Sequence, residues 1–177
     1  YIGLDSGVDH PFGAVLGVVT PKGIVIVKDY LERSLAPTTN IRNIQQQLAA
    51  GFSSPRYAAN KNEASLRLEY AQYGILVAPV DANQQAGIMR VHHWLACKQL
   101  WFVGASAGGD GKNAERTLRQ MASYRYAENR MADGSKREKE LVIKNNDELP
   151  DGGRYLCMSF PTLPKVPGIS SRESWDF

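Results

Sequence analysis

The sequence predicts an α/β domain with a mixed central sheet flanked by helices on both faces. Three segments rich in β-branched residues come first, at 2–5, 13–19 and 23–30, with turn residues between them. Apolar segments of strand length then alternate with segments of helical periodicity, which is the order of βα units. A run of strands followed by βα units predicts a sheet in which both strand directions occur.

Length and composition are those of one folded domain. The chain has 177 residues, of which 43% are hydrophobic and 22% charged, and this excludes a disordered or collagen-like protein. No apolar run reaches the roughly 18–20 residues of a membrane span, so no membrane association is expected. The chain opens on Tyr1 without an initiator Met or a signal peptide, and we expect it to be a fragment or a processed form of a longer polypeptide.

Helices are predicted after the third strand. Thr38, Thr39 and Asn40 are good caps for a helix that runs to Leu48. The segment 60–63 resembles a capping box before a second helix. The next predicted elements are strands at 74–79 and 99–103 and helices at 86–95 and 114–121.

The last third of the chain has three predicted parts. Residues 124–144 predict an added β-hairpin, because a turn sequence separates two arms. Asp147 is placed to cap a short final helix that runs to Met158. Residues 161–177 contain three prolines and few apolar anchors, so we expect an extended tail after a folded domain at 1–160.

Charge is distributed unevenly along the chain. The formal net charge is only +3, which by itself does not indicate nucleic-acid binding. From Arg33 to Arg67, however, five basic residues accompany a single acid, Glu63, and this predicts a local basic surface. Cys97 and Cys157 lie among apolar neighbours, which favours buried, reduced thiols of a cytosolic protein.

Carboxylates stand where predicted elements end. Asp5 ends the first strand, a position that suits a metal ligand and, equally, a turn-forming Asp. Asp147 and Asp151 are four residues apart on the last helix, where a cation would relieve their repulsion, although acids also cap helix amino-termini. A sheet brings such distant carboxylates together to hold Mg²⁺ or Mn²⁺, and two such ions support phosphodiester hydrolysis.

Three segments, in this order, resemble the C-terminal nuclease domain of tailed-phage large terminases. They are Gly3-Leu-Asp5-Ser-Gly7 with the two strands after it, 69–75 followed by 86–95, and Asn146-Asp147-Glu148-Leu-Pro-Asp151-Gly-Gly-Arg154-Tyr155. The resemblance runs from about Tyr1 to Phe160. It implies an RNase H-like fold and a metal-dependent endonuclease that cuts concatemeric double-stranded viral DNA during genome packaging.

The resemblance also implies the metal ligands. Asp5 and Asp151 fall on metal-binding positions of the family, and Asp147 would assist or bind a second ion. The family's middle acid falls on Asn60, which supplies no negative charge. A ligand from elsewhere, with Glu63 or Asp81 as the alternatives, an inactivating change or weak metal binding would each account for Asn60.

Two further departures concern the last helix. Glu148 stands where the family often has His, which leaves another carboxylate in place of a proton-transfer partner. Gly152 and Gly153 replace helix-forming residues at a cost of roughly 1 kcal/mol each, and they predict a short helix.

Basic side chains expected to hold DNA phosphates lie in the 33–67 segment and on the predicted hairpin. On the hairpin, aromatic and basic residues alternate as in a DNA-contacting arm, although the interspersed acids fit an ordinary solvated hairpin equally well. The expected phosphate-binding residues are Arg33, Arg56, Lys61, Arg125, Arg130, Lys136, Arg137 and Lys144. Contacts of this kind predict cleavage with little sequence preference.

The resemblance implies a set of partners as well. These are double-stranded DNA, the portal protein and small terminase subunit of a packaging motor, and an N-terminal ATPase domain that would precede Tyr1. It implies the host-cell cytoplasm as the location. Two alternatives stay open: another RNase H-like nuclease, such as a resolvase or transposase-like enzyme acting on branched DNA, and a catalytically impaired module that docks on DNA or on the portal.

Overall fold

The computed structural model describes residues 1–6, 10–81, 83–104, 113–125, 143 and 146–160. The strands are β1 (Ile2–Asp5), β2 (Phe12–Thr20), β3 (Gly23–Glu32), β4 (Tyr57–Asn60), β5 (Val77–Val80) and β6 (Leu100–Phe102). The helices are α1 (Pro37–Gln47), α2 (Ala64–Gln72), α3 (Gln84–Ala96), α4 (Glu115–Ser123) and α5 (Glu148–Met158). None of these helices has the length and apolar character needed to cross a membrane.

The six strands form one mixed sheet in the order β5-β4-β1-β2-β3-β6. β1, β2 and β3 are antiparallel neighbours, β4 and β5 run parallel to β1, and β6 runs parallel to β3. The predicted mixed sheet is therefore confirmed. Because β1, β4 and β5 are parallel, their carboxyl ends, at Asp5, Asn60 and Val80, meet at the same edge of the sheet.

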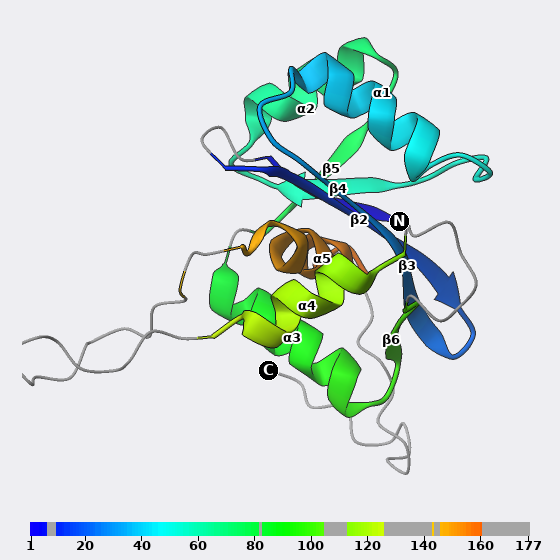
Figure 1. The fold of residues 1–177 in the computed structure, drawn as a ribbon, viewed down its shortest axis with the longest axis vertical. Coiled ribbons are helices and arrows are strands. Elements are labelled where there is room, and N and C mark those ends of the chain that lie inside the picture. The colour runs from blue at the N-terminus through cyan, green and yellow to red at the C-terminus, as the bar shows by residue number, and fades with distance from the viewer. Residues whose placement is uncertain (7–9, 82, 105–112, 126–142, 144–145, 161–177) are drawn as a thin grey trace, which may run out of the picture.

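Helices cover both faces of the sheet, as predicted (Figure 1). α1 and α2 lie on one face, and α3, α4 and α5 lie on the other. Side chains alternate along β2, so that neighbouring residues point to opposite faces of the sheet. Leu16 packs in a core with Ile44 and Tyr70. Val15 packs in a second core with Leu156 and Trp94. Each face of the sheet thus has its own apolar core.

Glycines set how closely α5 approaches the sheet. A Cβ atom on Gly3 of β1 would lie 1.9 Å from the carbonyl oxygen of Gly152, and a Cβ on Gly13 of β2 would lie 2.9 Å from the Cβ of Glu148. The predicted last helix is present with the predicted end, because α5 runs for 11 residues from Glu148 to Met158 and passes through Gly152 and Gly153. The close approach depends on Gly3, since a Cβ atom on Gly152 itself would lie 3.1 Å from the carbonyl oxygen of Gly3.

The predicted helix caps are wrong in detail. α1 begins at Pro37, with Ala36 at the N-cap, so the segment 38–40 lies inside its first turn. Glu63 occupies the N-cap position of α2, but its side chain makes no capping bond, so no capping box forms. Asp147 is the N-cap residue of α5 as predicted, also without a capping bond from its side chain.

Other predictions concern the thiols and the end of the chain. Cys97 and Cys157 are free and buried, as predicted. Most of the predicted hairpin, at 126–142 and 144–145, and the predicted tail at 161–177 lie outside the described residues. At the base of the hairpin, the backbone N–H of Ile143 donates a hydrogen bond to the carbonyl oxygen of Arg125 at 3.0 Å.

Candidate active site

Asp5, the last residue of β1, lies on the face of the sheet that α5 covers. Asp5 pairs with Gly13 across the β1–β2 ladder and follows Gly3 by two residues along β1. Side chains alternate along a strand, so Gly3, Asp5 and Gly13 share one face. α5 covers Gly3 and Gly13 on this face, because its backbone at Gly152 and Glu148 lies against them.

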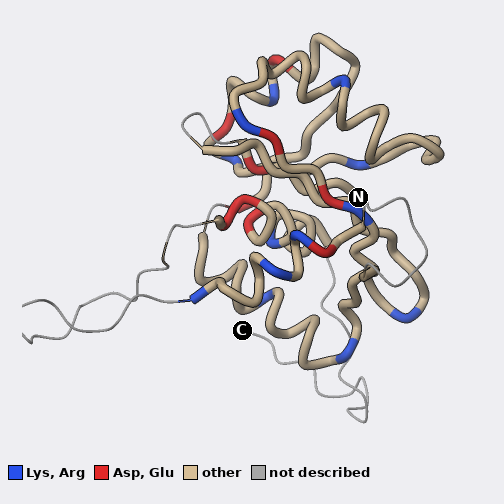
Figure 2. Tube along the Cα trace, viewed as in Figure 1, with Lys and Arg blue, Asp and Glu red and all other residues tan. Residues whose placement is uncertain are grey.

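The first turn of α5 brings more acidic residues to the same place. Glu148 lies against Gly13, next to Asp5 in the ladder, and Asp151 follows on the helix. Figure 2 shows several acidic segments, including the start of α5, on one side of the molecule, on the left of the view at the level of the sheet. Asp5 and Asp151, which are more than 140 positions apart in the sequence, both lie near enough to Tyr155 for their charges to act on its hydroxyl.

Asp151 is held by Arg154 of its own helix and by Tyr124, which Gln84 of α3 holds in turn. Arg154 donates from Nε to Oδ1 and pairs through Nη2 with Oδ2, both at 3.2 Å, and both side chains are almost fully buried. The hydroxyl of Tyr124, which ends α4, donates to Asp151 Oδ1 at 3.3 Å and accepts a bond from Gln84 of α3 at 3.1 Å. These contacts fix the position of the Asp151 carboxylate.

Glu63 precedes α2, which covers the opposite face of the sheet from α5. Its Oε2 accepts a hydrogen bond of 2.7 Å from the hydroxyl of Ser6, which follows Asp5. Burial raises the pKa of the Glu63 carboxyl and the negative charge of Asp151 raises it further, whereas Ser6 and Arg67 lower it. The effect of Asp151 shows that the two carboxylates repel each other at this edge of the sheet.

Asn60 fills the place of the expected middle acid with an uncharged amide. Its Nδ2 donates to the hydroxyl of Tyr155 at 3.3 Å, and its Oδ1 accepts from the backbone N–H of Asn62 at 2.9 Å. Burial raises the pKa of Tyr155, against the lowering effect of Arg154, and the charges of Asp5 and Asp151 raise it too. Tyr155 thus lies within the field of both predicted metal ligands.

The chemistry of these donors fits a hard divalent cation. Asp5, Glu63 and Asp151 all offer carboxylate oxygens, the ligands that Mg²⁺ and Mn²⁺ prefer. Within the described ranges, no three His, Cys, Asp or Glu side chains are already grouped closely enough to hold an ion.

Comparisons with known proteins address the fold. No protein-family model and no curated protein matches the sequence. The large terminase of a thermophilic bacteriophage, in complex with ADP, matches 90% of this chain with a TM-score of 0.74 at 19% identity. The nuclease domain of the bacteriophage SPP1 large terminase, solved with bound Mn, matches 87% of this chain and 82% of its own, with a TM-score of 0.62 at 12% identity. This chain has the fold of a large-terminase nuclease domain.

The P22 large terminase nuclease domain agrees, with a TM-score of 0.60 at 14% identity over 89% of this chain and 78% of its own. The predicted RNase H-like fold class is thereby confirmed. This chain spans only 39% of the large terminase from the thermophilic bacteriophage.

The terminase nuclease fold separates the predicted DNA-binding residues into two groups. Arg33, Lys61 and Arg125 are exposed and follow β3, β4 and α4 near the acidic end. Arg56 lies at the opposite edge, where its carbonyl accepts from Ile2 and its guanidinium stacks on the ring of Tyr1. The remaining four predicted residues, Arg130, Lys136, Arg137 and Lys144, lie outside the described residues.

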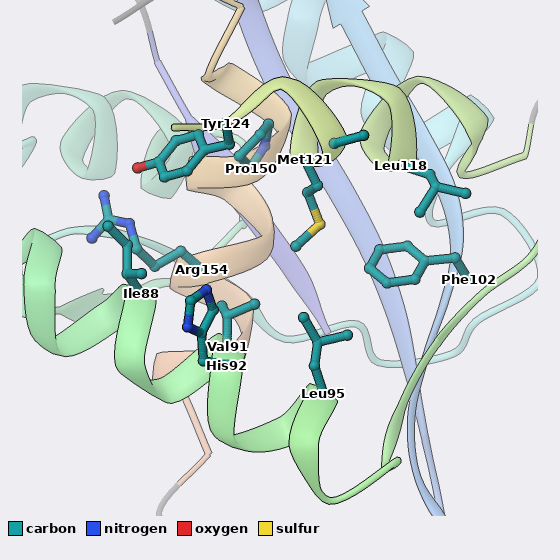
Figure 3. Close-up of a pocket in the computed structure, with 11 residues that line it drawn as sticks. Ile88, Val91, His92, Leu95, Phe102, Leu118, Met121, Tyr124, Pro150 and Arg154 are labelled. Carbon is teal, nitrogen blue, oxygen red and sulfur yellow. The ribbon is translucent and has the colours of Figure 1, made fainter. Parts of the chain in front are cut away.

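An apolar pocket of about 270 Å³ lies beside this site, between α3, α4 and α5 (Figure 3). Val91, Leu118 and Met121 are among the side chains that line it, and Arg154 and Tyr124 stand at one end. The described lining residues include no carboxylate, so the pocket does not match the needs of a metal ion. Its walls instead position the two residues that hold Asp151.

Sequence reasoning identified the acids and missed the groups that hold them. Gln84 and Tyr124 carried no signal, because their role depends on how three helices pack. Arg154 had two available signals, its place in the closing segment that resembles terminases and its spacing of three residues from Asp151 on a helix, which permits an ion pair.

Proposed function

We propose that this chain is the metal-dependent endonuclease domain of a large terminase and cuts concatemeric double-stranded viral DNA during genome packaging. One observation supports the proposal most: α5, which carries Asp151, packs its backbone against β1, the strand that Asp5 ends. The terminase nuclease fold and the oxygen donors at this edge support it.

Each predicted ligand has a part in this proposal. Asp5 and Asp151 would hold Mg²⁺ or Mn²⁺, and Asp147 would assist or bind a second ion. Two bound ions supply an activated water and stabilise the leaving oxygen in phosphodiester hydrolysis. Arg154 holds the Asp151 carboxylate in its orientation through the buried ion pair.

DNA would approach over the exposed basic residues at the acidic end. Arg33, Lys61 and Arg125 would bind backbone phosphates, which carry no sequence information, so cleavage would show little sequence preference. An ATPase domain in the same polypeptide, the portal protein and the small terminase subunit would be its partners, in the host-cell cytoplasm.

Nicking of supercoiled plasmid tests the proposal. We expect the chain to nick plasmid with Mn²⁺ or Mg²⁺ and to leave it intact with EDTA, because the acids repel the DNA phosphates unless a cation lies between them. Gel electrophoresis of the plasmid forms measures the effect. Nicking that persists in EDTA, or a chain that is inert with both ions, would contradict the proposal.

Asn60 favours one second function, a module that binds DNA without cutting it. The amide at this position removes a negative charge that the family's metal site normally has. A mobility-shift titration with linear double-stranded DNA separates the two functions, because the docking module would retard DNA in metal-containing buffer while leaving plasmid intact.

A further inference from the structure

The pocket between α3, α4 and α5 has a polar end and an apolar body (Figure 3). Arg154 and Tyr124 stand at the polar end, and Val91, Phe102 and Leu118 are among the apolar walls. Leu118 both lines the pocket and is 47% exposed, so this wall reaches the surface of the molecule. A space of this kind suits a molecule that carries one polar group on an apolar frame.

The Arg154 side chain is held in place at the polar end. Its Nε and Nη2 atoms both contact the Asp151 carboxylate at 3.2 Å. Its stem packs against α3, where a Cβ atom on Gly87 would lie 2.5 Å from Arg154 Cδ. Only 4% of the residue is exposed. The guanidinium therefore has a fixed position before any ligand arrives.

One nitrogen of this guanidinium is left without a partner. The Nη1 atom of Arg154 is buried and makes no hydrogen bond within the described part of the chain. The Tyr124 hydroxyl at the same end, by contrast, already donates to Asp151 and accepts from Gln84. A buried donor that has lost its water without gaining an acceptor is costly. A ligand that brings an acceptor to this end of the pocket would remove that cost.

Charge and size define the ligand further. Asp151 already neutralises Arg154, so an anionic ligand would compete with that carboxylate, and the guanidinium would repel a cationic one. A guanidinium offers donors only, so the polar group of the ligand must be an acceptor such as a carbonyl oxygen. The pocket volume of about 270 Å³ exceeds the roughly 150 Å³ of an apolar cavity that holds one benzene ring, which leaves room for a second ring.

We propose that this pocket binds a small neutral molecule of one or two fused rings, whose carbonyl oxygen accepts a hydrogen bond from Arg154 Nη1. The inference goes beyond the proposed function and requires no bound metal. The guanidinium that orients Asp151 would then also hold the ligand. The pocket is thus placed to connect a small molecule to the acidic site.

A nuclear magnetic resonance titration of the ¹⁵N-labelled chain tests the inference with two probes. 1-Indanone carries a ketone on two fused rings, and indane has the same two rings without the ketone. We expect 1-indanone to bind at least about tenfold more tightly than indane, as a hydrogen bond to a charged group implies, and to shift the Arg154 Nε–H resonance. Equal affinity of the two probes, or no binding of 1-indanone at millimolar concentration, would overturn the inference.

Leucine variants show where the probe binds. Leu118→Trp on α4 and Leu95→Trp on α3 each place a larger side chain on a partly exposed wall of the pocket. We expect each to weaken 1-indanone binding at least about tenfold, because the added ring takes up the space of the ligand. Leu68→Trp is the matched control, since Leu68 is an exposed leucine of α2 on the opposite face of the sheet, and it should bind as the unaltered chain does.

Circular dichroism checks that each variant folds, and the two pocket variants lie on different helices, so one of them suffices. A folded pocket variant that binds 1-indanone as tightly as Leu68→Trp would overturn the inference.

Discussion

Replacing Asp5 or Asp151 with Asn should reduce metal-dependent plasmid nicking by more than about 100-fold, since even residues that only support metal ligands cost about 10–100-fold when they are changed. Each change removes one negative charge from the place where α5 meets the end of β1. The rate of nicking with Mn²⁺, measured by gel electrophoresis, checks the result.

Asp81→Asn is the matched control. Asp81 is an acid just beyond β5 at the same edge of the sheet, but it is half exposed and paired with Lys61. We expect this variant to keep its nicking activity, because its charge is screened by water and by the lysine. Asp5→Asn or Asp151→Asn that folds, as judged by circular dichroism, and nicks as fast as Asp81→Asn would contradict the account.

Gly3→Ala should destabilise the fold by about 3 kcal/mol or more, beyond the usual cost of overpacking, because backbone blocks the added atom. A Cβ at Gly3 would lie 1.9 Å from the Gly152 carbonyl oxygen and 2.9 Å from the backbone nitrogen of Leu156. Helix α5 would have to move away from β1, and Asp151 would move with it. Urea unfolding followed by circular dichroism measures the loss of stability.

Gly153→Ala provides the control for this prediction. A Cβ at Gly153 meets no atom within 4 Å outside its own helix backbone and neighbours, although it lies one residue from Gly152 on α5. The variant should gain about 0.5–1 kcal/mol, the ordinary difference between Ala and Gly in a helix. Equal effects of the two substitutions would show that α5 does not depend on close contact with β1.

The opening strands were predictable from the local sequence, but β4 was not, because its four residues carry no clear strand pattern. β2 and β3 are long runs of β-branched residues joined by a tight turn, so local signals suffice. β4 has only the four residues Tyr57–Asn60, two of them Ala, and its pairing with β1 spans more than fifty positions. Only the resemblance to terminases placed a strand there, because long-range pairing leaves little trace in local composition.

The acids of the site were predictable, and their surroundings were not. Asp5 is the last residue of β1, and Asp151 lies in the first turn of α5. The residues around each of them predict where the strand ends and where the helix begins. The Tyr124 hydroxyl that binds Asp151 and the Ser6 hydroxyl that binds Glu63 depend on the packing of distant elements, whereas Arg154 binds Asp151 from the same helix. The close contact between Gly3 and the backbone of Gly152 was not predictable for the same reason, because it joins β1 to α5.

A crystal of the chain soaked in Mn²⁺ tests most directly whether Asp5 and Asp151 hold a divalent cation together. The anomalous signal of manganese locates the ion without reference to activity. We predict a peak at coordination distance, about 2.0–2.3 Å, from a carboxylate oxygen of each residue. A peak bound by other groups, or no peak while the Asp151–Arg154 pair stays unchanged, would contradict the account.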